Sequence, residues 1–262
     1  MMIRLDWNPL PHLGPVPINW YGLGAALGFF IGGYCVWLWS RDFPRLRANL
    51  EPLLAWIAAG VVIGARSYYV VQNLQEFSGR PLQVFAIWEG GMAYFGGLFG
   101  AIIFAVIYCL RKGLNFWTVA DRFSPGIAIG SAIGRIACGL DGMDYGTPTR
   151  LPWGIVYMNP NSYAPLDGIP RHPDQFYELL GDLVIAAVLA CMRGKVAEGI
   201  TFWSYLVMFS LLRFAVFIVR GNVEPVAFGL KNGQLTSLAI LVVAIPILLG
   251  SMLRRSSADR KA

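Results

Sequence analysis

The sequence is poor in charged residues, in histidine and in cysteine, and each shortage argues against a class of protein. Only 14% of its 262 residues are charged and 56% are hydrophobic, whereas soluble domains usually carry about a quarter charged residues. Its two histidines, His12 and His172, are too few for a histidine-built metal site. The four cysteines fall within or at the ends of apolar stretches and show no disulfide or metal-ligand spacing. We expect neither a soluble protein nor a metal or other cofactor.

What the sequence has instead is a series of apolar runs, each long enough to cross a bilayer as a helix. Seven of them lie near 18–40, 52–75, 90–110, 118–138, 176–192, 199–220 and 233–252. The absence of an internal repeat argues against a transporter built from two halves. The connection at 139–175 is too rich in Gly, Pro and Asp to cross the membrane. We predict an all-α, multi-pass membrane protein with one integral membrane domain, residues 1–262.

Basic residues are unequally divided between the two sets of loops. Eleven Arg and Lys residues fall in the loops after the first, third and fifth runs and in the C-terminal tail, against five in the other loops. Because cytoplasmic loops are richer in Lys and Arg, this predicts an N-terminus outside the cell and a cytoplasmic C-terminus. The 139–175 loop then faces outward. The asymmetry explains the net charge of +6, so no nucleic-acid partner is expected.

Arginines lie inside these runs, where each costs roughly 2.5–3.5 kcal/mol unless it finds an interior partner, a wet cavity or the interface. The four are Arg66, Arg135, Arg213 and Arg220. Arg220, near a span end, can reach the interface by snorkelling. Arg135 and Arg213 lie away from the predicted cytoplasmic ends, between apolar neighbours. They indicate a polar interior.

The arrangement of these arginines predicts an anion site. Arg213 and Arg220 are two helical turns apart and share a face, and the outer end of the fourth span brings Arg135 near them. The acidic residues inside the spans lie near other ends: Asp121 and Asp182. We therefore expect guanidiniums without matching carboxylates, a site for a phospholipid phosphate. In the alternative, Asp141 or Asp144 folds back to pair with Arg135.

Two other patterns concern helix packing and helix ends. Glycines recur every four residues, a spacing that lets helix backbones approach closely, at 24, 28 and 32 and at 126, 130 and 134. YFGGLFG (94–100) is consistent with close packing or with backbone near a ligand. RHPDQFYE (171–178) is adequately explained as a capped helix start, with Asp174 and Glu178 at the positive end of the dipole.

Several stretches, in order along the chain, carry a resemblance to a known family. They are INWYGLGAALGF (18–29), GARSYYV (64–70), GGLFG (96–100), ADRFSPGIAIGSAIGRIACGLDGMDYGTPTRLPWGI (120–155), RHPDQFYE (171–178), the arginine pair that ends in RGN (220–222), and GQLTSL (233–238). The block around Arg135 is the most specific. On these motifs the chain resembles the prolipoprotein diacylglyceryl transferases, bacterial inner-membrane enzymes, over nearly its whole length.

The resemblance implies seven spans, an outside N-terminus and transfer of the diacylglyceryl group of phosphatidylglycerol to the lipobox cysteine thiol of prolipoproteins. Arg135 matches the family's signature arginine, which contacts the lipid head group, and Arg213 matches its second essential arginine. Both would bind the phosphate and stabilise it as it leaves. The further substrate-binding candidates are Tyr21, Arg66, Gly96, Gly97, His172, Glu178 and Arg220.

The chain departs from the family at five site positions. Phe95 stands where some members have a histidine, Cys138 where asparagine is common and Met143 where some have glutamate. Phe217 replaces a glutamate one turn after the second arginine, and Phe209 replaces a tyrosine one turn before it. Loss of that glutamate removes an i,i+4 partner and leaves the cluster more positive.

The departures leave two questions open. The thiol proton could pass to Asp141 or Asp144, or the field of Arg135 and Arg213 could lower the thiol pKa directly. The chain could also be a paralogue with another lipid or acceptor, or a non-catalytic protein that binds anionic lipid.

Overall fold

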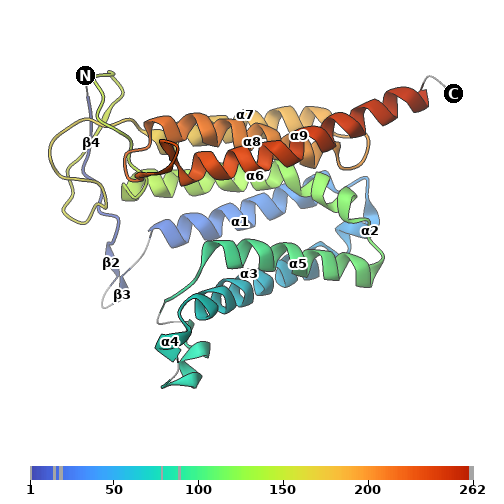
Figure 1. The fold of residues 1–262 in the computed structure, drawn as a ribbon, viewed down its shortest axis with the longest axis horizontal. Helices are drawn as coiled ribbons and strands as arrows, with labels where there is room; N and C mark the ends of the chain where they lie inside the picture. The colour runs from blue at the N-terminus through green and yellow to red at the C-terminus, as the bar shows by residue number, and fades with distance from the viewer. Residues whose placement is uncertain (1, 14–15, 18–19, 78, 88–89, 260–262) are drawn as a thin grey trace. The chain divides into compact units, whose positions relative to one another are not determined.

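The computed structural model describes residues 2–13, 16–17, 20–77, 79–87 and 90–259, and most of this chain is helical (Figure 1). Seven helices in this described portion are long and apolar enough to cross a membrane. They are α1 (Trp20–Trp39), α3 (Leu50–Gln72), α5 (Tyr94–Lys112), α6 (Phe116–Asp141), α7 (Asp174–Met192), α8 (Ile200–Val219) and α9 (Asn232–Asp259). The predicted all-α, seven-span fold is confirmed, with helix ends a few residues from those expected. Arg260 and Lys261, counted in the basic tail, lie outside the described residues.

Short elements fill the connections. These are the helices α2 (Pro44–Arg47) and α4 (Leu74–Phe77), the 3-10 helix η1 (Pro81–Phe85), and three strand pairs. β1 (Ile3–Leu5) pairs in parallel with β4 (Ile155–Tyr157), which ties the N-terminal segment to the connection between α6 and α7. The antiparallel pairs are β2 (His12–Leu13) with β3 (Val16–Pro17) and β5 (Pro225–Ala227) with β6 (Leu230–Lys231).

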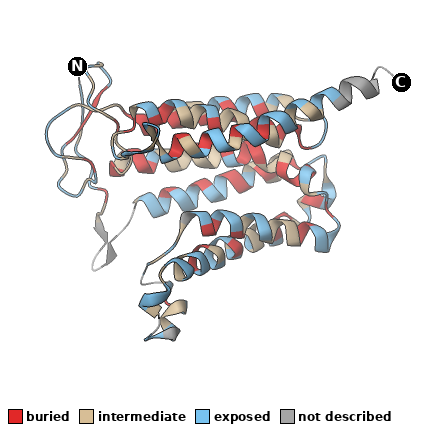
Figure 2. Cartoon of the chain, in the orientation of Figure 1, coloured by how far each residue is buried: buried red, intermediate tan, exposed pale blue. Residues whose placement is uncertain are grey.

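The chain forms two compact units, Met1–Val36 with Ala120–Ala262 and Trp37–Val119. In the first unit, α8 packs against both α7 and α9. Its hydrophobic core includes Ala128 of α6, Ile185 and Leu189 of α7, and Tyr205 of α8. Buried and exposed residues alternate along these helices (Figure 2), as expected for a bundle whose outer surface meets lipid. In the second unit, α3 packs along α5.

Glycine contacts bring helices together within both units. In the first, a Cβ on Gly28 of α1 would lie 2.4 Å from the carbonyl oxygen of Gly130 in α6, and one on Gly32 would lie 2.7 Å from that of Gly126. In the second, a Cβ on Gly96 of α5 would lie 2.3 Å from the carbonyl oxygen of Gly64 in α3. The predicted close packing is confirmed at these positions. Gly134 does not contribute, since a Cβ there would meet open space.

An acidic residue from another helix caps the start of α8. The Asp121 carboxylate of α6 accepts hydrogen bonds from the backbone N–H groups of Gly199 (2.6 Å) and Phe202 (2.7 Å). The first turn of a helix has N–H groups without intrahelical partners, and a carboxylate there also interacts favourably with the positive end of the helix dipole. The cap thus fixes α8 against α6, and with it the arginines farther along α8.

The connection between α6 and α7 is tied to the far end of α8. Thr147 donates its backbone N–H to the carbonyl of Val219 (2.7 Å), and Gly221 donates to that of Tyr145 (2.8 Å). Gly221 is required here because a Cβ would lie 2.6 Å from the carbonyl oxygen of Gly146. The α6 helix extends through Asp141, so this connection begins after Asp141 rather than at residue 139 as expected.

Candidate active site

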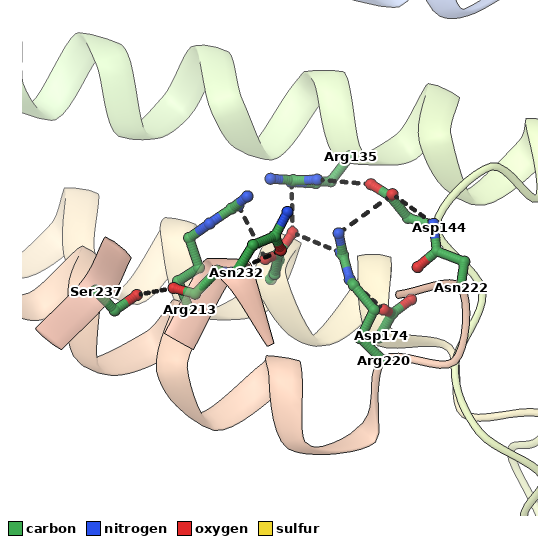
Figure 3. Close-up of polar contacts among 10 residues, drawn as sticks. Arg135, Asp144, Asp174, Arg213, Arg220, Asn222, Asn232 and Ser237 are labelled. Carbon is green, nitrogen blue, oxygen red and sulfur yellow. Dashed lines mark hydrogen bonds and ion pairs between the residues drawn. The ribbon is translucent and has the colours of Figure 1, made fainter. Parts of the chain in front are cut away.

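Charged side chains that include Arg135, Arg213 and Asp174 come together from three helices of the first unit (Figure 3). The buried carboxylate of Glu178, on α7, is the common partner of the arginines. Arg135 of α6 places Nε 2.7 Å from Glu178 Oε2. Arg220, just beyond α8, places Nη2 3.4 Å from the same oxygen. Arg213 of α8 places Nη1 3.6 Å from Oε1. One carboxylate therefore joins all three arginines that the sequence singled out on these helices.

Two further carboxylates complete the group, which we call the arginine cluster: Arg135, Arg213, Arg220, Asp144, Asp174 and Glu178. Asp144 bridges two arginines, with Oδ2 3.1 Å from Arg135 Nη1 and Oδ1 3.2 Å from Arg220 Nη1. Asp174 Oδ2 lies 2.9 Å from Arg220 Nε. Asn222 donates Nδ2–H to the Met143 carbonyl at 2.9 Å and lies 3.4 Å from Asp144 Oδ1. Three guanidiniums thus meet three carboxylates.

The expectation of guanidiniums without matching carboxylates is therefore wrong, and the alternative pairing of Asp144 with Arg135 is confirmed. The physical reason is that α7 begins inside the bundle, so Asp174 and Glu178 face the arginines rather than only capping a helix. Asp182, placed by the sequence near another end, lies one turn beyond Glu178 and interacts electrostatically with Arg135. Acidic residues at intervals of four, which share one helix face, were the signal that could have shown this.

The three arginines differ in exposure and therefore in what they can do. The Arg220 side chain is 4% exposed and pairs with three carboxylates, so the snorkelling interpretation is wrong. The side chains of Arg135 and Arg213 are 15% and 29% exposed. Among the described residues, Nη2 of Arg135 finds no hydrogen-bond or ion-pair partner. Arg220 is a buried support, while Arg135 and Arg213 border accessible space.

Carboxylates lie close to the arginines at two of the departures from the family pattern. Where Met143 replaces a glutamate, the next residue, Asp144, provides the carboxylate beside Arg135. Where Phe217 replaces another, Glu178 of α7 pairs with Arg213, and the cluster is not more positive as expected. Phe209 stacks on Tyr205 with ring centroids 5.7 Å apart, in the hydrophobic core.

The two candidate bases lie in different surroundings. Asp144 is 19% exposed and already engaged by two guanidiniums. Asp141 is buried, and its carboxyl group accepts a hydrogen bond from the backbone of Tyr21 in the first turn of α1. Its main-chain carbonyl accepts from the Tyr163 N–H at 3.0 Å. Asp141 therefore joins the end of α6 to the start of α1, while the Tyr21 side chain is 42% exposed.

His172 belongs to a polar group beside the start of α7. The indole N–H of Trp153 donates to the Tyr177 hydroxyl oxygen at 2.8 Å, and that hydroxyl lies 3.2 Å from His172 Nδ1. Nearby, burial raises the pKa of the Tyr157 hydroxyl well above its usual range.

The remaining candidates, Arg66, Gly96 and Gly97, belong to the second unit. The Arg66 guanidinium donates to four backbone carbonyls, those of Gln83 (2.5 Å), Val84 (2.8 Å), Gly90 (2.7 Å) and Gly91 (3.1 Å). Arg66 thus holds the segment between α3 and α5, and its charge is met by carbonyl dipoles rather than by a carboxylate. Gly96 and Gly97 are buried where α5 faces α3.

These features define a multi-pass membrane protein with a buried ionic cluster at one end of its bundle. A sequence model of the family "Prolipoprotein diacylglyceryl transferase" matches residues 9–249. The chain belongs to this family.

Similar proteins carry one name, phosphatidylglycerol–prolipoprotein diacylglyceryl transferase. The protein of that name from Geobacter sulfurreducens is 31% identical over 90% of this chain and 94% of its own length. One from Legionella pneumophila (strain Paris) is 33% identical over 94% of this chain and 97% of its own length. One from Bordetella bronchiseptica is 34% identical over 88% and 90%. The family and these names indicate a membrane-bound transferase.

Proposed function

We propose that this chain transfers the diacylglyceryl group of phosphatidylglycerol to the lipobox cysteine thiol of prolipoproteins, the first step of lipoprotein maturation. Family membership and the names of the relatives support this activity. The structural observation that carries the proposal is the pair Arg135 and Arg213, which share Glu178 and still border accessible space. An anion that approaches from that space meets two guanidiniums at once.

The geometry favours different roles for the three arginines in phosphate binding. Arg135 is fixed by its 2.7 Å contact with Glu178, and Nη2 has two N–H donors left for a phosphate oxygen. Arg213 lies 3.6 Å from Glu178 and its side chain is 29% exposed, so it is proposed to contact the ligand together with Arg135. Arg220 holds Asp144, Asp174 and Glu178 in place and has little exposed surface of its own.

In the reaction, the cysteine sulfur forms a bond to the glycerol carbon while the bond from that carbon to the phosphate oxygen breaks. The electron pair leaves with the glycerol phosphate, whose growing charge Arg135 and Arg213 stabilise. The thiol proton passes to a base, with Asp144 or Asp141 as the proposed acceptor. Asp144 already pairs with Arg135 and Arg220, so Asp141 is kept as the second candidate.

The proposed setting is the bacterial inner membrane, with the N-terminus outside and the C-terminus in the cytoplasm. The cluster then faces the outer side, where the signal peptides of prolipoproteins emerge. Tyr21 and His172 are proposed to contact substrate near the cluster. Arg66, Gly96 and Gly97 are proposed to bind lipid. No metal or nucleotide is proposed, and the described residues include no group of side chains suited to hold a metal ion.

Transfer is tested with purified protein in phosphatidylglycerol nanodiscs and a lipobox peptide, measuring the mass of the modified peptide and the released glycerol phosphate. Arg135→Ala is expected to lower kcat about 100-fold or more, the scale of losing one donor that stabilises a developing anion. The matched control is Arg111→Ala, an exposed arginine at the end of α5. Unchanged transfer in Arg135→Ala would refute the role of Arg135 in phosphate binding.

Two other results would favour the alternative functions. Binding of the lipid head group without release of glycerol phosphate would indicate a non-catalytic protein that binds anionic lipid. Failure of the chain to complement a transferase-depleted cell would indicate a paralogue with another lipid or acceptor.

A further inference from the structure

Phe217 lies inside the arginine cluster although it carries no charge. It is 2% exposed, it follows Arg213 by four residues on the same face of α8, and it precedes Arg220, just beyond the helix, by three. The Arg213 Cζ lies 4.7 Å from the centre of the Phe217 ring, and the Arg220 Cζ lies 4.6 Å from it. Both guanidiniums are thus within the range of a cation–π interaction with one ring.

The space for this ring depends on a glycine in a neighbouring helix. A Cβ on Gly233, in the first turn of α9, would lie 2.2 Å from Cε1 and 2.3 Å from Cζ of Phe217. A methyl group at Gly233 would therefore overlap the ring, and the ring or α9 would have to move. Gly233 and Phe217 therefore fit together, and the fit fixes the ring between the two arginines.

An aromatic ring at position 217 affects the formal charge of the cluster differently from a carboxylate. The cluster already pairs its three guanidiniums with three carboxylates, and Asp182 lies one turn away. A fourth carboxylate in the cluster would give it a negative formal charge, which opposes binding of a phosphate. An aromatic face attracts two cations and adds no charge.

We infer that Phe217 is a positioning residue: its ring holds the Arg213 and Arg220 side chains at the angles that let both meet Glu178, while the phosphate site keeps its positive side. The inference rests on the proposed function, since it concerns the arginine that would contact the leaving phosphate. The ring acts through Arg213 and is not itself in contact with the reacting atoms.

The test compares kcat and KM for phosphatidylglycerol in Phe217→Leu, Phe217→Tyr and Phe217→Glu. Phe217→Leu keeps an apolar side chain but loses the ring face, and it is expected to lower kcat/KM roughly tenfold. Phe217→Tyr keeps the face and is expected to stay within about threefold of the wild type. Phe217→Glu is expected to raise KM about tenfold or more, because it places a negative charge beside the phosphate.

Two further variants separate positioning from folding. Phe202→Leu makes the same change on the same helix, about 22 Å from Phe217 at 1.5 Å per residue, and is expected to leave kcat/KM unchanged. Gly233→Ala displaces the ring without changing it and is expected to match Phe217→Leu in kcat/KM. Thermal unfolding of each variant is recorded in parallel, so that loss of fold is seen separately.

The inference is overturned if Phe217→Leu keeps kcat/KM within twofold of the wild type, or if Phe217→Tyr falls as far as Phe217→Leu. It is also overturned if the Phe217→Leu loss follows its loss of thermal stability. A wild-type chain that binds phosphatidylglycerol without transfer would overturn the proposed function instead. The same variants would then be compared by their affinity for phosphatidylglycerol, with the same order expected.

Discussion

Replacing Glu178 by glutamine tests whether the arginine cluster depends on one shared carboxylate. Glu178 is 2% exposed at its side chain and lies 2.7, 3.4 and 3.6 Å from Arg135, Arg220 and Arg213. Removing one partner of a buried ion pair typically costs about 3–5 kcal/mol, because the remaining charges stay buried. Glutamine keeps the shape and one acceptor oxygen, so we expect Glu178→Gln to lower the free energy of unfolding by about 3 kcal/mol.

The assay is unfolding by denaturant in detergent micelles, followed by tryptophan fluorescence. Glu51→Gln is the matched control, since Glu51 is exposed in the first turn of α3 and is expected to contribute less than about 1 kcal/mol. A loss for Glu178→Gln within about 1 kcal/mol of this control would refute the reasoning. A double-mutant cycle adds a sharper criterion, because the 2.7 Å contact with Arg135 predicts a larger coupling energy than the 3.6 Å contact with Arg213.

The glycine contacts and the Arg66 hydrogen bonds give two more tests. Gly28→Ala puts a methyl group 2.4 Å from the Gly130 carbonyl oxygen and should lower the free energy of unfolding by about 1–3 kcal/mol. Gly22→Ala, with open space at its Cβ position, should not lower it. Equal free energies of unfolding in the two variants would contradict the contact between α1 and α6. Arg66→Met removes four hydrogen bonds to backbone carbonyls, each worth about 1.5–3 kcal/mol. Because these bonds hold the segment between α3 and α5, trypsin should cleave after Arg80 at least tenfold faster in the variant. An unchanged cleavage rate would refute the idea that Arg66 holds this segment.

The sequence predicted the spans well because lipid imposes a simple rule on length and hydropathy. All seven apolar runs became helices, since backbone groups in a bilayer must be satisfied within the segment. Close helix packing at Gly28 and at Gly130 was likewise predicted, because the four-residue spacing is a local property, but the pairing of these two glycines was not. The extension of α6 through Asp141 was missed because glycines and aspartates in that stretch read as a loop.

The sequence predicted the three arginines of the candidate site, named Glu178 as a substrate-binding candidate and offered Asp144 as a partner for Arg135. Arg135, Arg213 and Arg220 stood out because arginine is rare in apolar runs. The pairing of Asp174 and Glu178 with these arginines was missed, because acidic residues at a helix start have a sufficient local explanation in the dipole. Whether such residues also reach a neighbouring helix depends on where α7 starts within the bundle, which is tertiary information that one sequence does not contain.

Replaced acidic positions need not mean a lost site, for the same reason. A guanidinium needs a carboxylate at the right place in space, and the chain can supply it from any element that passes there. Asp144, which directly follows Met143, supplies one such carboxylate. Glu178 of α7 pairs with Arg213 although Phe217 stands one turn after that arginine on α8. Motif comparison shows which residue stands at each position along the chain, whereas ion pairing depends on distances in the folded structure.

The ionic cluster is better explained by chemistry than by stability. Apolar residues that fill the same volume as a buried ionic group often leave a protein as stable or make it more stable by about 1–4 kcal/mol. In lipid the incentive is stronger, because an arginine such as Arg135 or Arg213 adds an insertion cost of roughly 2.5–3.5 kcal/mol. If stability alone determined these positions, an apolar residue such as leucine would be favoured there, as leucine is found elsewhere along α8. The glycine contacts therefore account for how the bundle packs, and we propose that the cluster serves the transfer reaction.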